Sequence, residues 1–321
     1  MMNSIRPRQD YIDEISGLLI IAMVLIHIAS RCNYDNTILI RAFFFFMPWF
    51  YFKSGFFYKQ ASLKGVAKKG VKKLLKPFVF FTVIAVVLDF LFSQDRLVIV
   101  DNIKVMFFCG TAKSNIPLWF LMSLFVVQIV SIFVLKSKSS NLGGGAILLL
   151  ICFTSIVGYC LQQIELKLPE YLAYNVLGTG FYLSGFMYNK YRETGFHKYL
   201  LLVASVLLFF NYLILPSFIH IKSNRHECGN YFLWIYSSIS ACIVLMYVWN
   251  YFRIKVPALR YVGRHAMLIL CSHWIVINVL DIVFGDDFDI SARFVLYVIL
   301  VGIIEIMLCR FEKELKLEKL F

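Results

Sequence analysis

Apolar stretches of about 20 residues recur along nearly the whole chain and limit the folds open to it. A helix rises about 1.5 Å per residue, so about 20 residues cross the roughly 30 Å hydrocarbon core of a bilayer. The 321 residues are 60% hydrophobic and only 16% charged, whereas soluble domains carry about 25% charged residues. The stretches are continuously apolar rather than alternating, which excludes a membrane β-barrel. The sequence therefore predicts an all-α integral membrane protein.

Hydropathy and helix-breaking residues divide the chain into ten predicted membrane-spanning helices. They cover residues 15–32, 39–58, 77–94, 117–135, 145–162, 171–189, 198–217, 230–252, 262–284 and 292–310. No connection between them is long enough for a soluble domain, so residues 1–321 are expected to form a single polytopic transmembrane domain. The longest outer connection, about 95–116, has room for a short interfacial helix.

Lysine and arginine are unevenly distributed between the two sides of this topology. If the N-terminus is inside, the inner segments hold 22 of the 32 basic residues and the outer segments hold eight. This positive-inside bias predicts a multi-pass protein of the inner or plasma membrane with both termini cytoplasmic. The net charge of +13 is then a consequence of topology and does not indicate a nucleic-acid partner.

The inner segment KQASLKGVAKKGVKKLLKP, which ends at Pro77, is amphipathic and basic. One interpretation is that its lysines anchor the chain to anionic lipid headgroups. The other is that they also attract a phosphate-bearing cytoplasmic ligand. The sequence leaves both interpretations open.

The eight cysteines show no spacing typical of a metal site, and we expect no metal. Cys32, Cys109 and Cys228 fall at or near the predicted outer face, where a disulfide is compatible with the spacing but not required by it.

Six polar or ionisable side chains fall at comparable depths within the predicted spans. They are His27, Lys53, Asp89, Gln128, His273 and Glu305. Ionisable groups inside a membrane are costly and usually face a protein interior or a water-filled cavity. Several of them in one layer predict an internal polar cavity.

Each of these side chains also has a purely structural interpretation. His27 can hydrogen-bond a neighbouring carbonyl group, and Lys53 can extend its long stem to the inner headgroups. Glu305 can pair with Arg310, and Gln128 can join two helices by a hydrogen bond.

Four strings in the chain carry a resemblance to a known family. They are YIDEISGLLIIAMVLIH (11–27), FFFFMPWFYFKSGFFYK (43–59), IPLWFLMSLFVVQ (116–128) and YVGRHAMLILCSHW (261–274). Together and in this order they resemble the acyltransferase 3 family of integral membrane acyltransferases. The resemblance covers nearly the full chain, and no single string would suffice.

The resemblance implies an O-acyltransferase, usually an acetyltransferase. Such an enzyme moves the acyl group from cytoplasmic acyl-CoA to a hydroxyl of a cell-surface sugar, a polysaccharide or a lipid-linked glycan. Acyl-CoA is then the co-substrate, no metal cofactor is expected, and the partners are membrane lipid and the glycan acceptor.

The resemblance also assigns candidate residues. His27 matches the catalytic histidine of the family, and Asp13 matches the acidic residue that begins its motif. Ser54 and Gly55 match a Ser-Gly pair of the second span, and Trp119 matches the start of span four.

One position departs from the family pattern. The family's basic residue, eleven positions before the histidine, falls here on Ser16. Eleven residues are about three turns, so Ser16 and His27 share a helix face. A serine cannot supply a cation to CoA phosphates or to a developing charge. We hypothesise that Lys53 or Arg41 does so, and with Trp119 these are the candidate cofactor-binding residues.

The expected chemistry suits a histidine. An imidazole can take a hydroxyl proton and return it to a departing thiolate near neutral pH. Glu305 or Asp89 could orient the ring, with His273 as another supporting group in the same layer. Lys53, a tryptophan N–H or the Ser54 hydroxyl could stabilise an oxyanion. Direct transfer and a covalent acyl intermediate on His27 or a serine both remain open.

Two other functions compete with acyl transfer. A transporter or flippase for a lipid-linked sugar would also need ten spans and a polar cavity, although the paired helix interruptions typical of such proteins are absent from the sequence. A non-catalytic descendant of an acyltransferase would explain Ser16. It would tolerate substitution of His27.

Overall fold

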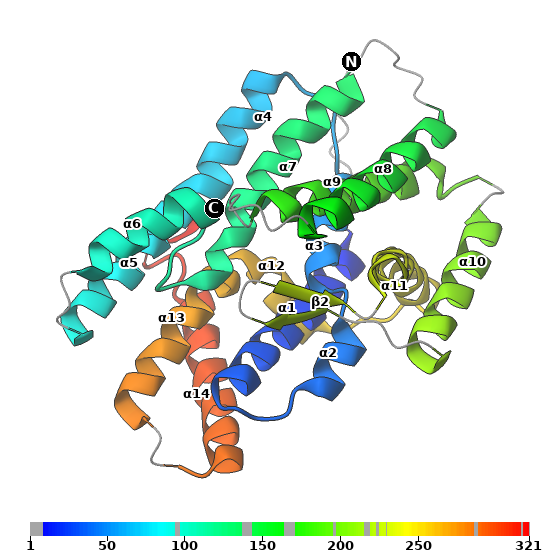
Figure 1. The fold of residues 1–321 in the computed structure, drawn as a ribbon. Coiled ribbons are helices and arrows are strands. Elements are labelled where there is room, and N and C mark those ends of the chain that lie inside the picture. The colour runs from blue at the N-terminus through cyan, green and yellow to red at the C-terminus, as the bar shows by residue number, and fades with distance from the viewer. Residues whose placement is uncertain are drawn as a thin grey trace.

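The computed structural model describes residues 9–93, 97–136, 143–163, 171–194, 197–214, 219–222, 225–228, 230–285, 288–315 and 317–320. The described chain is almost wholly helical (Figure 1). Its helices are α1 (Asp10–Arg31), α2 (Thr37–Phe43), α3 (Phe46–Phe56), α4 (Leu63–Gly70), η1 (Val71–Leu75), α5 (Lys76–Ser93), α6 (Leu97–Cys109), η2 (Ile116–Leu118), α7 (Trp119–Lys136), α8 (Gly144–Gln163), α9 (Tyr171–Tyr191), α10 (His197–Phe209), η3 (Phe210–Ile214), α11 (Tyr231–Tyr251), α12 (Pro257–Arg264), α13 (Ala266–Phe284), α14 (Ile290–Arg310) and η4 (Leu317–Lys319). A short antiparallel pair, β1 (Ile219–Lys222) and β2 (Arg225–Cys228), lies between α10 and α11.

Seven helices in the described part of the chain are long and apolar enough to cross a membrane. They are Asp10–Arg31, Leu63–Phe92, Ile116–Leu135, Gly144–Leu161, Tyr231–Tyr251, Ala266–Phe284 and Ile290–Arg310. The other three predicted spans, at 39–58, 171–189 and 198–217, are not among these seven. Helices α2 and α3 occupy most of the first, α9 covers the second, and α10 and η3 cover 198–214 of the third. The all-α, multi-pass class is therefore confirmed. Of the ten predicted spans, seven coincide with helices that are long and apolar enough to cross a membrane. The helix expected within 95–116 is present as α6.

The predicted span 39–58 is wrong as a single helix, because the chain breaks between α2 and α3. Pro48 is the third residue of α3. Proline has no N–H, and its ring clashes with the carbonyl four residues earlier, so it is tolerated only in the first turn of a helix. A new helix therefore begins just before Pro48.

Pro77, unlike Pro48, does not interrupt the helix, which continues from η1 into α5. The basic segment does not end there, because α4, η1 and α5 form one candidate span of 30 residues, Leu63–Phe92. The turn before Pro77, η1, is π-helical. Such a widened turn accommodates the missing N–H and the bulk of the proline ring.

Helix α1 is the centre of the bundle. It contacts α2, α3, α11, α12, α13 and α14. Of the apolar stretch of α1, 78% is buried inside the protein, whereas the corresponding share is 28% for α8 and for α14. Gly17 of α1 and Gly263 of α12 lie against each other's backbone. A methyl group at either position would collide with main-chain atoms, so both glycines are required for this close approach.

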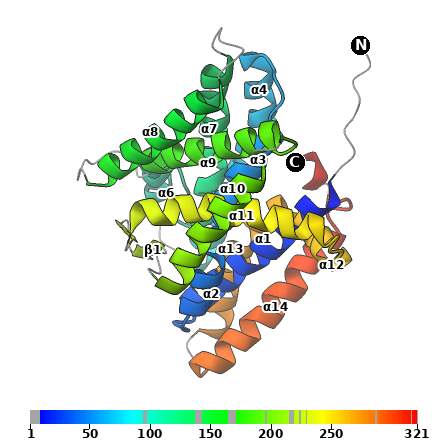
Figure 2. The ribbon, with the colours of Figure 1, turned by 90° about the vertical axis from the view of Figure 1, so that its right-hand side faces the viewer.

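Both described ends of the chain lie at the same end of the bundle, near α12 (Figure 2). Arg264 of α12 pairs with Asp10, the first residue of α1. The Lys76 ammonium group donates to the carbonyl oxygen of Lys319, near the C-terminus. The first and last described segments are therefore joined to neighbouring helices at this end of the bundle.

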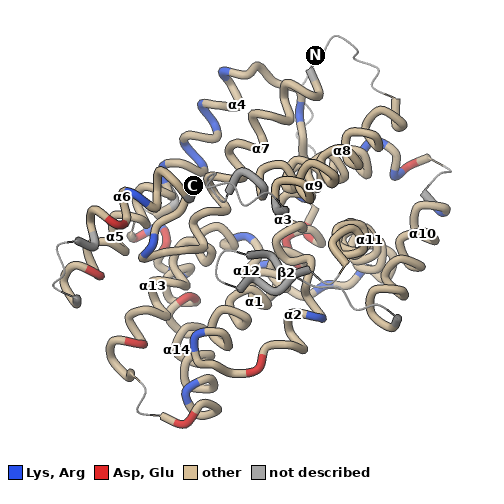
Figure 3. The backbone as a smooth tube through the Cα atoms, viewed as in Figure 1, with Lys and Arg blue, Asp and Glu red and all other residues tan. Residues whose placement is uncertain are grey.

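Six of the seven lysines of the basic segment lie along α4, η1 and the start of α5 (Figure 3), and Lys59 precedes α4. All seven, from Lys59 to Lys76, are exposed. No ion pair with a carboxylate involves them in the part of the chain that the structure describes.

Cys32 is a free thiol, so it is not part of a disulfide. The side chains of Cys109 and Cys228, the other two cysteines predicted near the outer face, lie outside the described residues.

Candidate functional site

Two histidines from distant parts of the sequence meet where α1 packs against α13. The Nδ1 atom of His27 lies 2.9 Å from Nε2 of His273. His273 is completely buried, and His27 is half-buried. The other nitrogen of His273, Nδ1, lies 2.7 Å from the carbonyl oxygen of Ile269. The edge of Trp274 packs against the His27 ring, with 5.3 Å between ring centroids.

The expected carboxylates are not the groups found beside His27. Glu305 accepts from the Ser272 hydroxyl, whose oxygen is 2.8 Å from each carboxylate oxygen. Asp89 lines a small cavity with Ser114 and Asn278. Among the described residues, neither carboxylate contacts either histidine of the pair. The side chain that contacts the Nδ1 atom of His27 is His273, not Glu305 or Asp89.

A second polar cluster surrounds Ser16, nearer the start of α1. The Lys53 ammonium nitrogen lies 2.8 Å from the Ser16 hydroxyl oxygen and 3.8 Å from a carboxylate oxygen of Asp13. The indole N–H of Trp49 donates to the same hydroxyl at 3.1 Å. The hydroxyl itself donates to the carbonyl oxygen of Ile12 at 2.7 Å.

A cation, the Lys53 ammonium group, therefore lies beside Ser16, which carries no charge of its own. Lys53 comes from α3 and brings its charge to the face of α1 where the resemblance led us to expect a basic side chain. Arg41, the other candidate, lies on α2 and is exposed. The sequence placed His27, Lys53 and His273 at one depth, but the three side chains do not form one cluster. His273 contacts His27, whereas Lys53 contacts Ser16.

Acidic residues at the beginning of α1 bind the basic face of α12. Glu14 has no exposed surface and accepts from Arg260 at 2.8 Å and from the Trp249 indole at 2.9 Å. Asp10 pairs with Arg260 at 3.0 Å and with Arg264 at 3.1 Å. The hydrogen bond with Glu14 raises the pKa of the Arg260 guanidinium above its ordinary value, so the guanidinium stays charged.

Three other residues of the resemblance make contacts between helices. Gly55 lies against the backbone of Tyr182 on α9, where a side chain would not fit. Ser54 accepts from Gln128 at 3.1 Å, so Gln128 joins α7 to α3, as its structural interpretation predicted. Trp119 packs on Tyr174 of α9 with ring centroids 4.5 Å apart.

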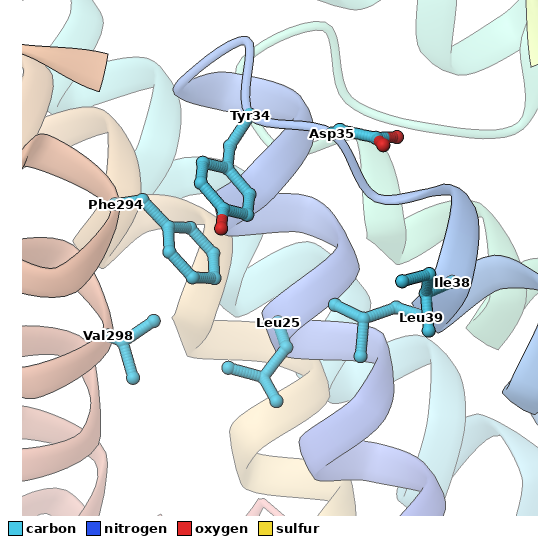
Figure 4. Close-up of a pocket in the computed structure, with 7 residues that line it drawn as sticks. All are labelled: Leu25, Tyr34, Asp35, Ile38, Leu39, Phe294 and Val298. Carbon is cyan, nitrogen blue, oxygen red and sulfur yellow. The ribbon is translucent and has the colours of Figure 1, made fainter. Parts of the chain in front are cut away.

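One pocket in the described part of the chain lies apart from the histidine pair. Its volume is about 430 Å³, and it opens between α1, α2 and α14 (Figure 4). Its lining is mainly apolar and comprises Leu25, Tyr34, Asp35, Ile38, Leu39, Phe294 and Val298. Leu25 and His27 are two residues apart on a helix and therefore point to different faces. We assign no catalytic part to this pocket.

Several contacts at these sites were not predicted from the sequence. Trp49 and Trp274 lie inside the quoted strings, but their partners come from other helices. The Glu14–Arg260 pair had one available signal, since Asp10, Asp13 and Glu14 are spaced to lie on one helix face. The carbonyl of Ile269 carries no signal in a sequence.

Comparison with known proteins decides the family. The profile of the acyltransferase 3 family, described as an acyltransferase domain, matches residues 9–309. The chain belongs to this family. No curated protein and no solved structure matches the acyltransferase. Both the His27–His273 pair and the Lys53–Ser16 contact lie inside the matched range, as does nearly the whole of the acyltransferase. Across the described residues no three His, Cys, Asp or Glu side chains are grouped closely enough to hold a metal ion.

Proposed function

We propose that this membrane acyltransferase moves an acetyl group from cytoplasmic acetyl-CoA to a hydroxyl of a cell-surface sugar, a polysaccharide or a lipid-linked glycan. The observation that carries the proposal is the His27–His273 pair within an acyltransferase chain. A half-buried imidazole whose Nδ1 is already engaged has its second nitrogen left for a substrate proton.

In this proposal His27 is the general base. It takes the proton of the acceptor hydroxyl as the oxygen attacks the thioester carbonyl. The same nitrogen then returns the proton to the leaving sulfur, so one residue serves both halves of the transfer. A covalent acyl intermediate on His27 remains the alternative sequence of steps.

Lys53 supplies the cation that the family carries at position 16. Its ammonium group is held by Ser16 and lies close to Asp13, which keeps it at a defined point on α1. A lysine binds a phosphate as a point charge, so the proposed role of Lys53 is to bind the CoA phosphates or to stabilise charge that develops during transfer. The contact supports an active enzyme over a member disabled by Ser16.

The lysine-rich face of α4 and η1 supports entry of the donor from the cytoplasm. It carries five of the seven exposed lysines of the basic segment, which is expected to be inside. The acceptor would then approach from the outer side or the outer leaflet, and acyl groups would cross the membrane through the bundle.

The proposal is tested with purified protein in lipid nanodiscs, radiolabelled acetyl-CoA and a panel of candidate glycans. We expect wild-type protein to transfer label and His27→Ala to lose transfer by at least about 100-fold, the usual scale of a general base. Full activity in His27→Ala would refute the assigned role. Movement of a lipid-linked sugar without consumption of acetyl-CoA would identify a transporter instead.

His265 provides a matched control for this substitution. It lies between α12 and α13, where Nδ1 approaches the Tyr261 carbonyl oxygen at 2.8 Å and Nε2 lies 3.2 Å from Glu312. His265→Ala removes a histidine from the same protein without touching the His27–His273 pair, so transfer should persist.

A further inference from the structure

We propose that His273 is a positioning residue that holds His27 in one tautomer, with the proton on Nδ1 and a bare Nε2. The tautomer follows from contacts within the protein alone. Its catalytic meaning rests on the proposed function, because only a bare Nε2 can take a proton from an acceptor hydroxyl.

The backbone decides the protonation of His273. Its Nδ1 atom lies 2.7 Å from the carbonyl oxygen of Ile269, and a carbonyl oxygen can only accept. The proton of the neutral ring is therefore on Nδ1. A neutral imidazole has one donor and one acceptor nitrogen, so Nε2 of His273 must be the acceptor.

That acceptor in turn decides the protonation of His27. Nδ1 of His27 lies 2.9 Å from Nε2 of His273, so Nδ1 of His27 must be the donor. The remaining nitrogen, Nε2 of His27, then has a free lone pair. The Ile269 carbonyl oxygen thus determines, through His273, that Nε2 of His27 carries no proton.

The ring geometry agrees with a hydrogen bond between edges. The two planes differ by only 9°, and the ring centroids are 5.1 Å apart. Each nitrogen lies about 1.1 Å from its ring centre, given bond lengths of about 1.35 Å. The 2.9 Å contact plus the two ring radii nearly equals the centroid separation. The rings therefore face each other edge to edge rather than face to face.

A charged ring would be poorly supported at this place. His273 is completely buried, and among the described contacts of the pair there is an indole edge but no carboxylate. Burial of an unpaired charge is expensive. The resting pair is accordingly neutral, and the chain of donors runs from His27 to His273 to the Ile269 carbonyl.

The chemical step uses this arrangement. As the acceptor oxygen bonds to the acyl carbon, its proton moves to Nε2 of His27, and the carbon–sulfur bond breaks. The proton then passes from Nε2 to the thiolate sulfur, which gives an ester and free CoA thiol. While His27 carries the proton, its Nδ1–H still donates to His273 and shares the charge. His273 touches neither substrate.

The first test reads the tautomer without any acyl transfer. Full-length protein labelled with ¹⁵N-histidine is placed in lipid bilayers, and the six histidines are examined by solid-state NMR. The His27 resonances are identified by their loss in His27→Gln. We expect His27 to show a protonated Nδ1 and an unprotonated Nε2. An unprotonated Nδ1 in the wild type would overturn the proposal.

Two substitutions of His273 separate positioning from packing. In His273→Gln the side-chain oxygen can replace Nε2 as the acceptor, whereas His273→Leu fills space but accepts nothing. We expect His27 to keep its tautomer in the glutamine variant and to shift toward an Nε2-protonated ring in the leucine variant. An unchanged His27 spectrum in His273→Leu would also overturn the proposal.

The second test measures label transfer from acetyl-CoA in the same variants. We expect kcat to fall about 100-fold in His273→Leu, with the KM for acetyl-CoA within twofold of wild type, and to fall less than about fivefold in His273→Gln. Equal kcat values in the two variants would contradict a positioning role. His265→Leu and His265→Gln are the controls, because His265 makes the same type of backbone contact but does not touch His27.

The two tests also keep this inference distinct from the proposed function. If NMR shows the expected tautomer and its loss in His273→Leu, but wild-type protein transfers no label, then the acyl-transfer proposal fails and the tautomer stands. If transfer is observed and the tautomer is not, His27 acts without help from His273. Each variant is first checked by size-exclusion chromatography in detergent. A folded variant elutes as a single peak, and a variant that does not is excluded from both measurements.

Discussion

The ammonium nitrogen of Lys53 lies 2.8 Å from the hydroxyl oxygen of Ser16. Lys53 is on α3 and Ser16 is on α1, so a cation from one helix lies beside a serine of its neighbour, 37 residues away in the sequence. In the proposed function this cation takes the place of the basic side chain that the resemblance expects at position 16.

Removal of that charge should weaken use of the donor. A charge-assisted hydrogen bond contributes about 1.5–3 kcal/mol, and about 1.4 kcal/mol corresponds to a tenfold change in affinity. We expect Lys53→Met to raise the KM for acetyl-CoA by about 10- to 100-fold, as measured by initial rates of label transfer.

A charge relocation provides the control for Lys53. Lys53→Arg should stay close to wild type, and Ser16→Arg combined with Lys53→Met should recover most of the lost affinity, because the family's own arrangement is restored. A double variant as impaired as Lys53→Met alone would show that the cation is not the important property of Lys53.

The far end of α1 should depend on Asp281 for stability. This carboxylate accepts from Arg31, from Arg293 at 2.7 Å and from the Tyr297 hydroxyl at 2.8 Å. Replacement of the carboxylate by an amide removes the negative charge with which Arg31 and Arg293 both pair, and a hydrogen bond to a charged group contributes about 1.5–3 kcal/mol. Asp281→Asn should therefore lower the Tm of the detergent-solubilised protein markedly.

Asp289 is the matched carboxylate for this experiment. It caps the first turn of α14 and is exposed, and asparagine caps a helix about as well as aspartate. Asp289→Asn should leave the Tm unchanged. Similar Tm values for the two variants would show that the Asp281 network adds no stability.

The close approach of α1 and α12 should be sensitive to a single methyl group. A Cβ at Gly263 would meet the backbone of Asp13 and Gly17, and main-chain atoms cannot rotate away as a flexible side chain can. Gly263→Ala should separate the two helices and lower the Tm. Thermal unfolding followed by circular dichroism measures this effect.

Gly302 on α14 is the control for Gly263. A Cβ there would meet nothing within 4 Å, and alanine is the better helix former by about 0.5–1 kcal/mol. Gly302→Ala should keep or slightly raise the Tm. A decrease as large as that of Gly263→Ala would contradict the steric explanation.

The orientation in the membrane can be measured by cysteine labelling. Lys69 lies in the basic segment expected inside, and Asp35 lies in the connection after α1 expected outside; both are exposed. In a variant without native cysteines, Lys69→Cys in intact cells should resist a membrane-impermeant maleimide, whereas Asp35→Cys should react. The reverse pattern would invert the topology, and reaction of both would disprove that the two positions lie on opposite sides.

The helical class and the family were predictable because both depend on local properties of the sequence. Runs of apolar residues must form helices in a bilayer, where no water can satisfy the backbone. The four strings fall within residues 9–309, the range of the family match. Hydropathy was less informative where proline intervened. Pro48 starts a new helix, whereas Pro77 is absorbed by a π-helical turn, and the outcome depends on what packs against each.

The sequence by itself therefore determined an all-α, multi-pass acyltransferase with His27 as its leading candidate residue. Only the tertiary structure decided which polar groups meet. Lys53 reached Ser16, and His27 met His273 rather than Glu305. The physical reason is that the partner of a side chain depends on how each helix is rotated and how closely it approaches its neighbours. Backbone contacts such as those of Gly17 with α12 set both, and no local pattern in the sequence encodes them.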